Sequence, residues 1–420
     1  VIVANDGENA IELSLPEDSN GLGYQNLISM IFRLMSFRDA WMRVGKAAAA
    51  NEALTPPLHL VLIEEPEAHL HTQVQQVFIR QAYKVLRKHG NLRDSKALKT
   101  QLVVSTHSSY IAHESDFDHL RYFRRLPAAN SSIPLSSVVN LGAVFGTDVK
   151  TKRFVTRYIK VTHCDLFFAD AAIFVEGPAE RILVPFFVRT RPELAVLNEC
   201  YITWLEIGGS HAHRLRSLVE HLGLTTLIIT DLDACDAKGK KAIPRRGAGL
   251  STRNQTLKTW CPENSDLDAL MNLDAEAKSK RYAEQRFSVR VAYQCPVKIE
   301  FKGNKTEAYC IALEDALVME NQTLFDTQAG IGLWAKFKAA IETSDDVEAL
   351  GEAILSALDN GGKAEFALNL LELKEPTQLQ PPFYIRDGLN WLIGQLKERQ
   401  HELGVAASVP VENSEAEEAS

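Results

Sequence analysis

Short apolar runs alternate with amphipathic segments through the middle of the chain. The runs at 171–176, 201–206 and 225–231 have the length of buried strands, and the segments 178–190 and 211–222 between them have helical spacing. This alternation predicts a parallel sheet flanked by helices, because parallel strands need crossover connections. The residues that follow these strands should therefore meet at one edge of the sheet.

Two more apolar runs with polar ends lie in the N-terminal third, at 59–65 and 101–107. The pattern changes after Trp260, where 289–295 and 297–301 alternate between apolar and polar positions as strands do. We therefore predict an α/β chain: one α/β domain, a second α/β domain with a parallel sheet flanked by helices, and a helical or mixed C-terminal extension.

Acidic residues follow two of the central runs. Glu176 and Glu180 lie four apart and face the same side if a helix starts after Gly177. Asp231 and Asp233 lie two apart, which places them on one face of an extended strand end. Four acids at one edge repel one another, and a divalent cation such as Mg²⁺ relieves that repulsion. The pattern predicts a metal-dependent site for phosphoryl transfer.

The same acids carry a family resemblance. Residues 175–180 (VEGPAE) and 231–233 (DLD) look like the two signatures of Toprim domains, the phosphoryl-transfer modules of primases, topoisomerases and certain nucleases. The flanking segments 163–170 and 207–210 resemble the OLD (overcoming lysogenisation defect) family of ATPase-coupled nucleases. The resemblance implies that the metal ligands are Glu176, Glu180, Asp231 and Asp233, with Glu176 also in the catalytic set.

Further residues enter through this resemblance alone. Glu314, in the segment Leu-Glu-Asp-Ala-Leu, matches the family's later acidic motif and is implied as a ligand of a second metal. Lys363, at a predicted helix start, is implied to stabilise charge on the scissile phosphate. The segments 252–254 and 381–392 also resemble family segments, the first without a clear chemical role and the second structural.

The N-terminal third resembles part of an ABC-type ATPase of the RecF/SMC-like branch. The run 59–65 ends in Glu64 and Glu65, as a Walker B strand does, and the run 101–107 ends in His107, as a switch-histidine strand does. Upstream, 19–26 resembles the signature loop, in which glycines and a helix N-terminus cap a nucleotide phosphate. The implied nucleotide-site residues are Ser19, Gly21, Gly23, Glu64, Glu65 and His107.

One ATPase motif is missing from the sequence. No G-x-x-x-x-G-K-[ST] loop occurs in the chain, and the Gly361-Gly362-Lys363 segment lacks its spacing. The chain also starts at Val1 rather than at a methionine. We therefore expect it to be the C-terminal part of a longer protein and to hydrolyse ATP poorly by itself.

Composition changes this picture little. The 420 residues are 45% hydrophobic and 24% charged with a net charge of −8, and no apolar run approaches membrane-spanning length, so a cytoplasmic protein without membrane partners is expected. The six cysteines have no C-x-x-C spacing and are expected to be reduced thiols. Two segments, 150–160 and 238–253, are rich in Lys and Arg, and the second suits a phosphate backbone entering the acidic site.

The expected domain boundaries follow from these patterns. Residues 1–125 form the ATPase part, 126–164 a connector, 165–260 the Toprim core, 261–400 a Toprim-associated helical or mixed region, and 401–420 an acidic disordered tail.

The sequence thus predicts a metal-dependent DNA endonuclease of the OLD type, coupled to ATP in a full-length homodimer and associated with phage defence. Two Mg²⁺ or Mn²⁺ ions per site are implied, with Ca²⁺ as a crystal substitute, and ATP in the full-length protein. Three alternatives stay open: a topoisomerase-like enzyme, an RNA-directed nuclease and a non-catalytic ATP-gated DNA clamp.

Overall fold

The computed structural model describes residues 2–6, 9–13, 21–45, 54–92, 96–126, 135–208, 211–284, 286–358 and 361–402. Ser19 and the expected acidic tail lie outside these ranges. The chain divides into two compact units: the first unit holds Val1–Leu120 with Lys160–Cys164, and the second unit holds Arg121–Ile159 with Asp165–Ser420.

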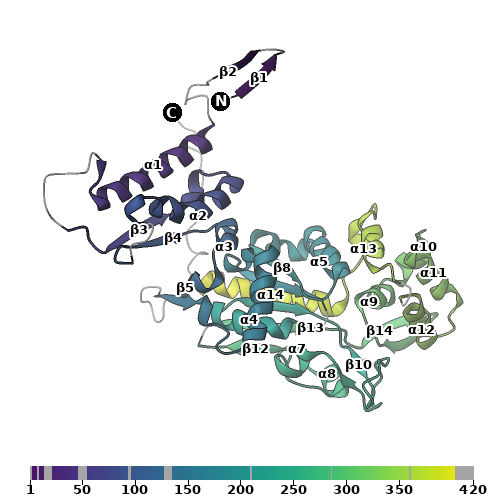
Figure 1. Ribbon diagram of the computed structural model, residues 1–420. Helices are drawn as coiled ribbons and strands as arrows, with labels where there is room; N and C mark the ends of the chain where they lie inside the picture. Colours follow the sequence, from purple (N-terminus) through teal and green to yellow (C-terminus); the bar gives the residue numbers. More distant parts are fainter. Residues whose placement is uncertain are drawn as a thin grey trace, which may run out of the picture. The chain divides into compact units, whose positions relative to one another are not determined.

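The first unit contains a two-stranded parallel sheet with helices (Figure 1). Strands β3 and β4 pair so that Glu64 lies opposite Ser105. Helix α2 presents Phe78, Ala82 and Leu86 at every fourth position, and these side chains enter a small core. The elements are β1 Ile2–Asp6, β2 Asn9–Leu13, α1 Leu22–Met42, β3 Leu58–Glu64, α2 Thr72–Arg87, β4 Lys99–Ser105 and α3 Ser109–Glu114.

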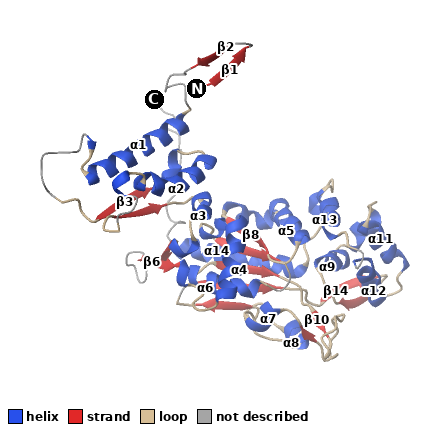
Figure 2. Cartoon of the chain, viewed as in Figure 1, coloured by secondary structure: helices blue, strands red, loops and turns tan. Residues whose placement is uncertain are grey.

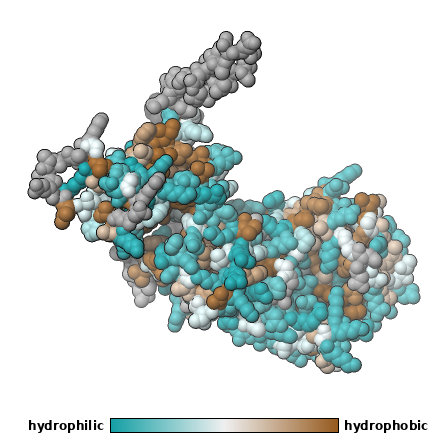
Figure 3. Space-filling model, viewed as in Figure 1, coloured by the Kyte–Doolittle hydropathy of each residue, from teal (hydrophilic) through white to brown (hydrophobic). Residues whose placement is uncertain are grey.

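Much apolar surface of the first unit is open among the described residues. On β3, Val61 is 5% exposed whereas Leu60 and Leu62 are 52% and 70% exposed, so one face of the strand is packed and the other is not. Apolar surface also gathers over α1, where Leu22 and Phe32 are exposed (Figure 3).

The second unit is built on a mixed sheet with helices around it (Figure 2). Its elements up to the sheet's last strand are β5 Arg121–Leu126, β6 Leu135–Asn140, α4 Val149–Thr162 (whose last residues belong to the first unit), β7 Ala171–Val175, α5 Pro178–Thr190, β8 Ile202–Glu206, α6 Arg216–Leu222, β9 Thr225–Ile229, β10 Ala234–Cys235, β11 Ser251–Thr252, α7 Gln255–Thr259, α8 Leu267–Asn272, β12 Ser279–Tyr282 and β13 Phe287–Ala292. The remaining elements are β14 Val297–Phe301, β15 Asn304–Ala308, α9 Leu313–Glu320, α10 Gln322–Thr327, α11 Leu333–Thr343, α12 Val347–Leu358, α13 Lys363–Leu371 and α14 Phe383–Glu402.

The strand order of this sheet is β12-β13-β9-β7-β8. The pairs β13–β9, β9–β7 and β7–β8 are parallel, and β12 is antiparallel to β13 at the edge. The predicted parallel sheet is confirmed, because the runs at 171–176, 201–206 and 225–231 form β7, β8 and β9 with ends shifted by one or two residues. Strand β12 was not predicted.

Helix α14 lies against the sheet. At Gly388 of this helix, a β-carbon would lie 3.0 Å from side-chain atoms of Leu227 and of Ala292. The helix therefore approaches β9 and β13 through a residue without a side chain. The same hydrophobic core continues into the C-terminal helices, including Phe325 and Phe366. The C-terminal region and the sheet are therefore one packed body. No helix in the described ranges has the length and apolarity of a membrane span.

Candidate metal centre

Glu176 is the first residue after β7, at the carboxyl end of a fully buried strand. One oxygen of its carboxylate accepts hydrogen bonds from the Thr230 hydroxyl (2.8 Å) and the Asp231 backbone N–H (2.9 Å). Because Thr230 and Asp231 follow the neighbouring strand β9, these bonds tie the two strand ends together. The acids predicted at one sheet edge are brought together here.

Glu180 lies in the first turn of α5, which begins at Pro178 as the sequence predicts. Its carboxylate turns back to accept the Gly177 N–H at 3.1 Å, so it satisfies one of the free donors at the helix start. Glu180 is 8% exposed. A buried acid at this position faces the edge where Glu176 lies.

The two aspartates after β9 do not share an extended strand, and that expectation is wrong. The strand ends at Ile229, and Asp233 has a left-handed backbone with φ of 51°. Asp231 accepts a hydrogen bond from Gln294 at 2.6 Å, whereas Asp233 lies 3.6 Å from the guanidinium of Arg253. The chain therefore turns between the two carboxylates and gives them different partners.

Glu314 and Lys363 come from the C-terminal helices. Glu314, in the first turn of α9, is 1% exposed, and its carboxylate accepts from the Lys363 ammonium group at 2.9 Å. Lys363 is the first residue of α13, which packs against α5. The structure thus brings the predicted lysine beside one of the predicted ligands.

The pKa values show that these acids share one electrostatic environment. Burial, with repulsion from Glu314 and Glu176, raises the pKa of Glu180 to about 7. Burial also raises the pKa of Glu176 and, together with Glu176 and Glu180, holds the pKa of Asp231 well above its usual range. Burial lowers the pKa of Lys363, but attraction from Glu314, Asp231 and Glu180 outweighs it, so the net shift is upward. Buried negative charge here lacks enough compensating positive charge.

The donor set fits a divalent cation. Each of these four carboxylates has at least one protein donor: the Thr230 hydroxyl and the Asp231 backbone N–H for Glu176, the Gly177 N–H for Glu180, Gln294 for Asp231 and Lys363 for Glu314. Within the described ranges, no three acidic, histidine or cysteine side chains already converge closely enough to hold a metal. Metal binding would need these carboxylates to move closer to a shared point. Oxygen donors with excess negative charge are what Mg²⁺ and Mn²⁺ prefer.

Polar residues to which the sequence assigned no chemical role support the acids. Asn254 is fully buried and donates to the Thr230 hydroxyl (2.7 Å) and the Asp231 carbonyl (2.9 Å). Thr230 in turn donates to Glu176, so a relay runs from Asn254 to the carboxylate. Gln294, 2% exposed, lies within 3.4 Å of the Tyr384 hydroxyl. The segment 252–254 was noticed only through the family resemblance. No local signal in the sequence predicts that it is buried.

The first unit brings together part of the predicted nucleotide site. Glu64 ends β3, and Glu65 beyond it lies 3.3 Å from the His107 imidazole. Glu67 accepts hydrogen bonds from the Thr106 hydroxyl (2.8 Å) and the His107 N–H, which fixes the residue after β4. Gly21 caps the N-terminus of α1 and Gly23 lies in its first turn.

Comparison with protein families decides the assignment of the second unit. Residues 167–233, which include both acidic motifs, match the family model for the Toprim domain of overcoming lysogenization defect protein-like proteins. The second unit carries an OLD-like Toprim domain. The resemblance seen in 175–180 and 231–233 is thereby confirmed. Residues 4–112 match the model of an AAA ATPase domain, which confirms an ATPase-type fold ahead of the Toprim domain.

Curated relatives agree with this assignment. Endonuclease GajA of Bacillus cereus (strain HuB5-5) is 27% identical over 411 residues, which cover 92% of this chain and 54% of GajA. The OLD nuclease of Thermus scotoductus is 27% identical over 172 residues, 41% of this chain and 28% of that protein. The chain spans about half the length of GajA.

A solved structure is also similar. The C-terminal region of the Burkholderia pseudomallei OLD protein aligns with 55% of this chain and 99% of its own length, at 21% identity and a TM-score of 0.33.

Proposed function

We propose that the Toprim domain is the nuclease centre of an OLD-type endonuclease that hydrolyses phosphodiester bonds of DNA with divalent cations. The observation that carries this proposal is a cluster of four acids beside one lysine, in which Glu180 and Glu314 are buried and Glu176 and Asp231 are partly buried. Relatives named endonuclease and nuclease support the reaction class. Bound Mg²⁺ or Mn²⁺ would neutralise the acids, activate water and stabilise the leaving oxygen.

Each residue has a role in this proposal. Glu176, Glu180, Asp231, Asp233 and Glu314 hold the cations, with Glu314 serving a second ion. The Lys363 ammonium group, bonded to Glu314 and half-exposed, is placed to offer positive charge to a scissile phosphate. Asn254 and Gln294 keep the loop after β9 in place through their hydrogen bonds.

In the longer protein we propose that ATP binding at Gly21, Gly23, Glu64, Glu65 and His107, with Ser19, gates the nuclease. A homodimer acting in the cytoplasm in phage defence completes this proposal. Part of its support is that Glu65 and His107 already lie 3.3 Å apart.

The decisive experiment is nicking of supercoiled plasmid by the purified chain with Mg²⁺ or Mn²⁺. Wild type should nick, Asp231→Ala should not, and Glu372→Ala, which removes an exposed acid on the C-terminal side of α13, should behave as wild type. A clamp without catalysis predicts no nicking by any variant. A topoisomerase predicts protein covalently attached to DNA after a denaturing quench. An RNA-directed nuclease predicts cutting of RNA alone.

A further inference from the structure

Strand β10 directly follows the proposed ligand Asp233, and the connection from β10 to β11 is rich in positive charge. Between Cys235 and Ser251 it carries five cations and one acid, Asp236, in a chain whose net charge is −8. Such a local excess of positive charge next to the proposed phosphoryl-transfer site would attract a negatively charged substrate.

The base of this connection is fixed relative to the acids. Ala234 pairs with Thr252 and Cys235 with Ser251, and the Arg253 N–H donates to the Asp233 carbonyl at 2.9 Å. The Thr252 hydroxyl also donates to the Leu232 carbonyl at 2.6 Å. The connection is therefore tied to the segment that holds Asp231 and Asp233.

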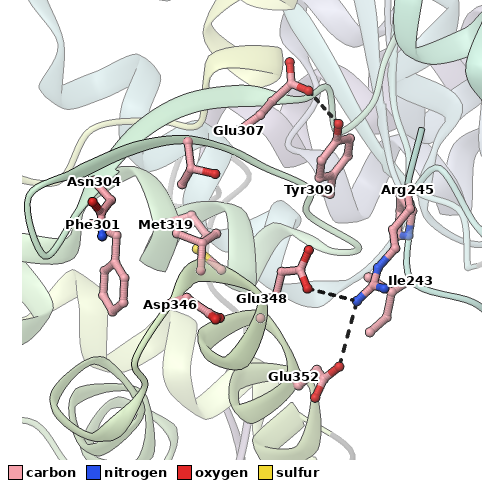
Figure 4. Close-up of a pocket in the computed structure, with 14 residues that line it drawn as sticks. Ile243, Arg245, Phe301, Asn304, Glu307, Tyr309, Met319, Asp346, Glu348 and Glu352 are labelled. Carbon is pink, nitrogen blue, oxygen red and sulfur yellow. Dashed lines mark hydrogen bonds and ion pairs between the residues drawn. The ribbon is translucent and has the colours of Figure 1, made fainter. Parts of the chain in front are cut away.

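The arginines in the second half of the connection are used internally. Arg246 lies 3.1 Å from Glu307 and also donates to Asn272. Arg245 reaches toward Glu348 and Glu352, at 3.6 and 4.0 Å, across the wall of a cavity of about 350 Å³ (Figure 4). These pairs hold this half of the connection against the C-terminal region and neutralise its charge.

The lysines in the first half of the connection do not form such ion pairs within the described part of the chain. Lys238, Lys240 and Lys241 are exposed, and no acid in the described part of the chain forms an ion pair with them. The backbone N–H groups of Lys238 and Lys240 both donate to one Asp236 carboxylate oxygen at 2.9 Å, which orders the turn that carries them. The turn is thus a pre-shaped cationic tip.

The tip can reach the same nucleic acid as the acids do. Lys238 is five positions after Asp233 in the chain, so their α-carbons lie within about 18 Å of each other. Duplex DNA carries one phosphate charge for about every 1.7 Å of its axis, so several phosphates fall within that span.

We propose that Lys238, Lys240 and Lys241 bind the phosphate backbone of duplex DNA beside the cleavage site, while Arg245 and Arg246 hold the loop in place. This division of labour rests on the proposed nuclease function for the identity of its ligand. Of the six cations in the segment 238–253, the proposal therefore assigns DNA contact to these three lysines.

The test is the salt dependence of binding to a fluorescent 20-bp duplex, read by anisotropy in Ca²⁺ buffer. Three variants are compared with wild type: a tip variant, K238Q/K240Q/K241Q; an anchor variant, R245Q/R246Q; and a charge-matched control, K336Q/K374Q/K397Q, which removes three exposed lysines elsewhere in the second unit. Each phosphate contact contributes about 0.9 to the slope of log K against log salt. The slope of log K against log salt should therefore be about 2–3 smaller in magnitude for the tip variant than for wild type. Its affinity at low salt should be at least about tenfold lower.

The other variants separate the two roles. The control should keep the wild-type slope, and the anchor variant should bind more weakly with its slope nearly unchanged. The proposal is overturned if wild type does not bind, if the tip and control variants behave alike, or if the anchor variant loses as much slope as the tip variant. Plasmid nicking is scored separately. If the tip variant loses slope but the wild type never nicks plasmid, only the nuclease assignment fails. If the wild type nicks plasmid but the tip variant keeps the wild-type slope, only the present inference fails.

Discussion

The proposed acids of the two units lie in opposite environments. In the first unit, Glu64 is exposed and the Glu65 side chain is 50% exposed, with His107 81% exposed beside it. In the second unit, Glu180 is 8% and Glu314 1% exposed. An exposed carboxylate keeps its charge at little cost, whereas a buried one needs a compensating cation. The difference indicates that Glu180 and Glu314 are enclosed by the fold of the second unit, whereas Glu64, Glu65 and His107 of the first unit still face solvent.

The largest expected effect contrasts one acid from each unit. Glu176→Gln should lower plasmid nicking by at least about 10³-fold, because a metal ligand contributes several kcal/mol to the reaction. Without ATP, Glu65→Gln should change nicking by less than about twofold, since the exposed pair with His107 is proposed to act in ATP gating and not in the cut. Equal losses in both variants would break the comparison.

The pH dependence of stability gives the next effect. The pKa of Glu180 is raised from 4.5 to about 7, so between these values the folded state binds this proton more tightly than the unfolded chain does. The free energy of unfolding without metal should then fall as pH rises from about 4.5 through 7, by on the order of 3 kcal/mol. Excess Mg²⁺ should reverse the loss.

Tryptophan fluorescence in urea measures this change mainly in the second unit, since Trp41 is the single tryptophan of the first. Glu180→Gln should flatten the decline above pH 5. A metal-free protein that grows more stable toward pH 8 would contradict the assigned environment.

Removal of Lys363 has a smaller expected effect on stability. Lys363→Met leaves Glu314, 1% exposed, without its 2.9 Å partner, which should cost about 2 kcal/mol because a buried charge loses its hydrogen bond. Adding Glu314→Gln should restore most of that loss. In the first unit, His107→Ala removes an exposed pair and should cost less than about 0.5 kcal/mol. Urea denaturation of the four proteins checks both values, and Lys374→Met serves as the surface control.

The smallest expected effect concerns the relay behind Glu176. Thr230→Val removes the hydroxyl between Asn254 and Glu176 and should weaken Mn²⁺ binding about tenfold, as loss of a supporting hydrogen bond does at metal sites. Thr226→Val is the matched control, because its buried hydroxyl, on the strand β9 that precedes Thr230, bonds the Leu224 carbonyl instead. Titration calorimetry measures the Mn²⁺ affinity of both variants. Equal affinities would show that the hydrogen-bond relay does not support metal binding.

The fold was predictable to the extent that local pattern controls it. The buried strands β7 and β9 and the helix after Pro178 follow from apolar runs and from the residues that start a helix, and all three appear within two residues of their expected ends. The sequence missed β12 because an edge strand of four mostly polar residues has no apolar alternation. It also missed the turn at Asp233, since a left-handed backbone at an aspartate leaves no periodic signal.

The sequence by itself determined that acids follow two neighbouring strands, because strand ends are local features and parallel connections bring them to one edge. The tertiary structure decided which distant residues join them. Helix α13 packs against α5, and its Lys363 bonds Glu314 of α9. Hydrogen bonds from the buried Asn254 and Gln294 fix the loop after β9. It also decided which cations of the β10–β11 connection stay exposed, because ion pairs such as that of Arg246 with Glu307 join residues far apart in the chain. Charge in the sequence is a property of each residue, whereas its neutralisation depends on the folded neighbours.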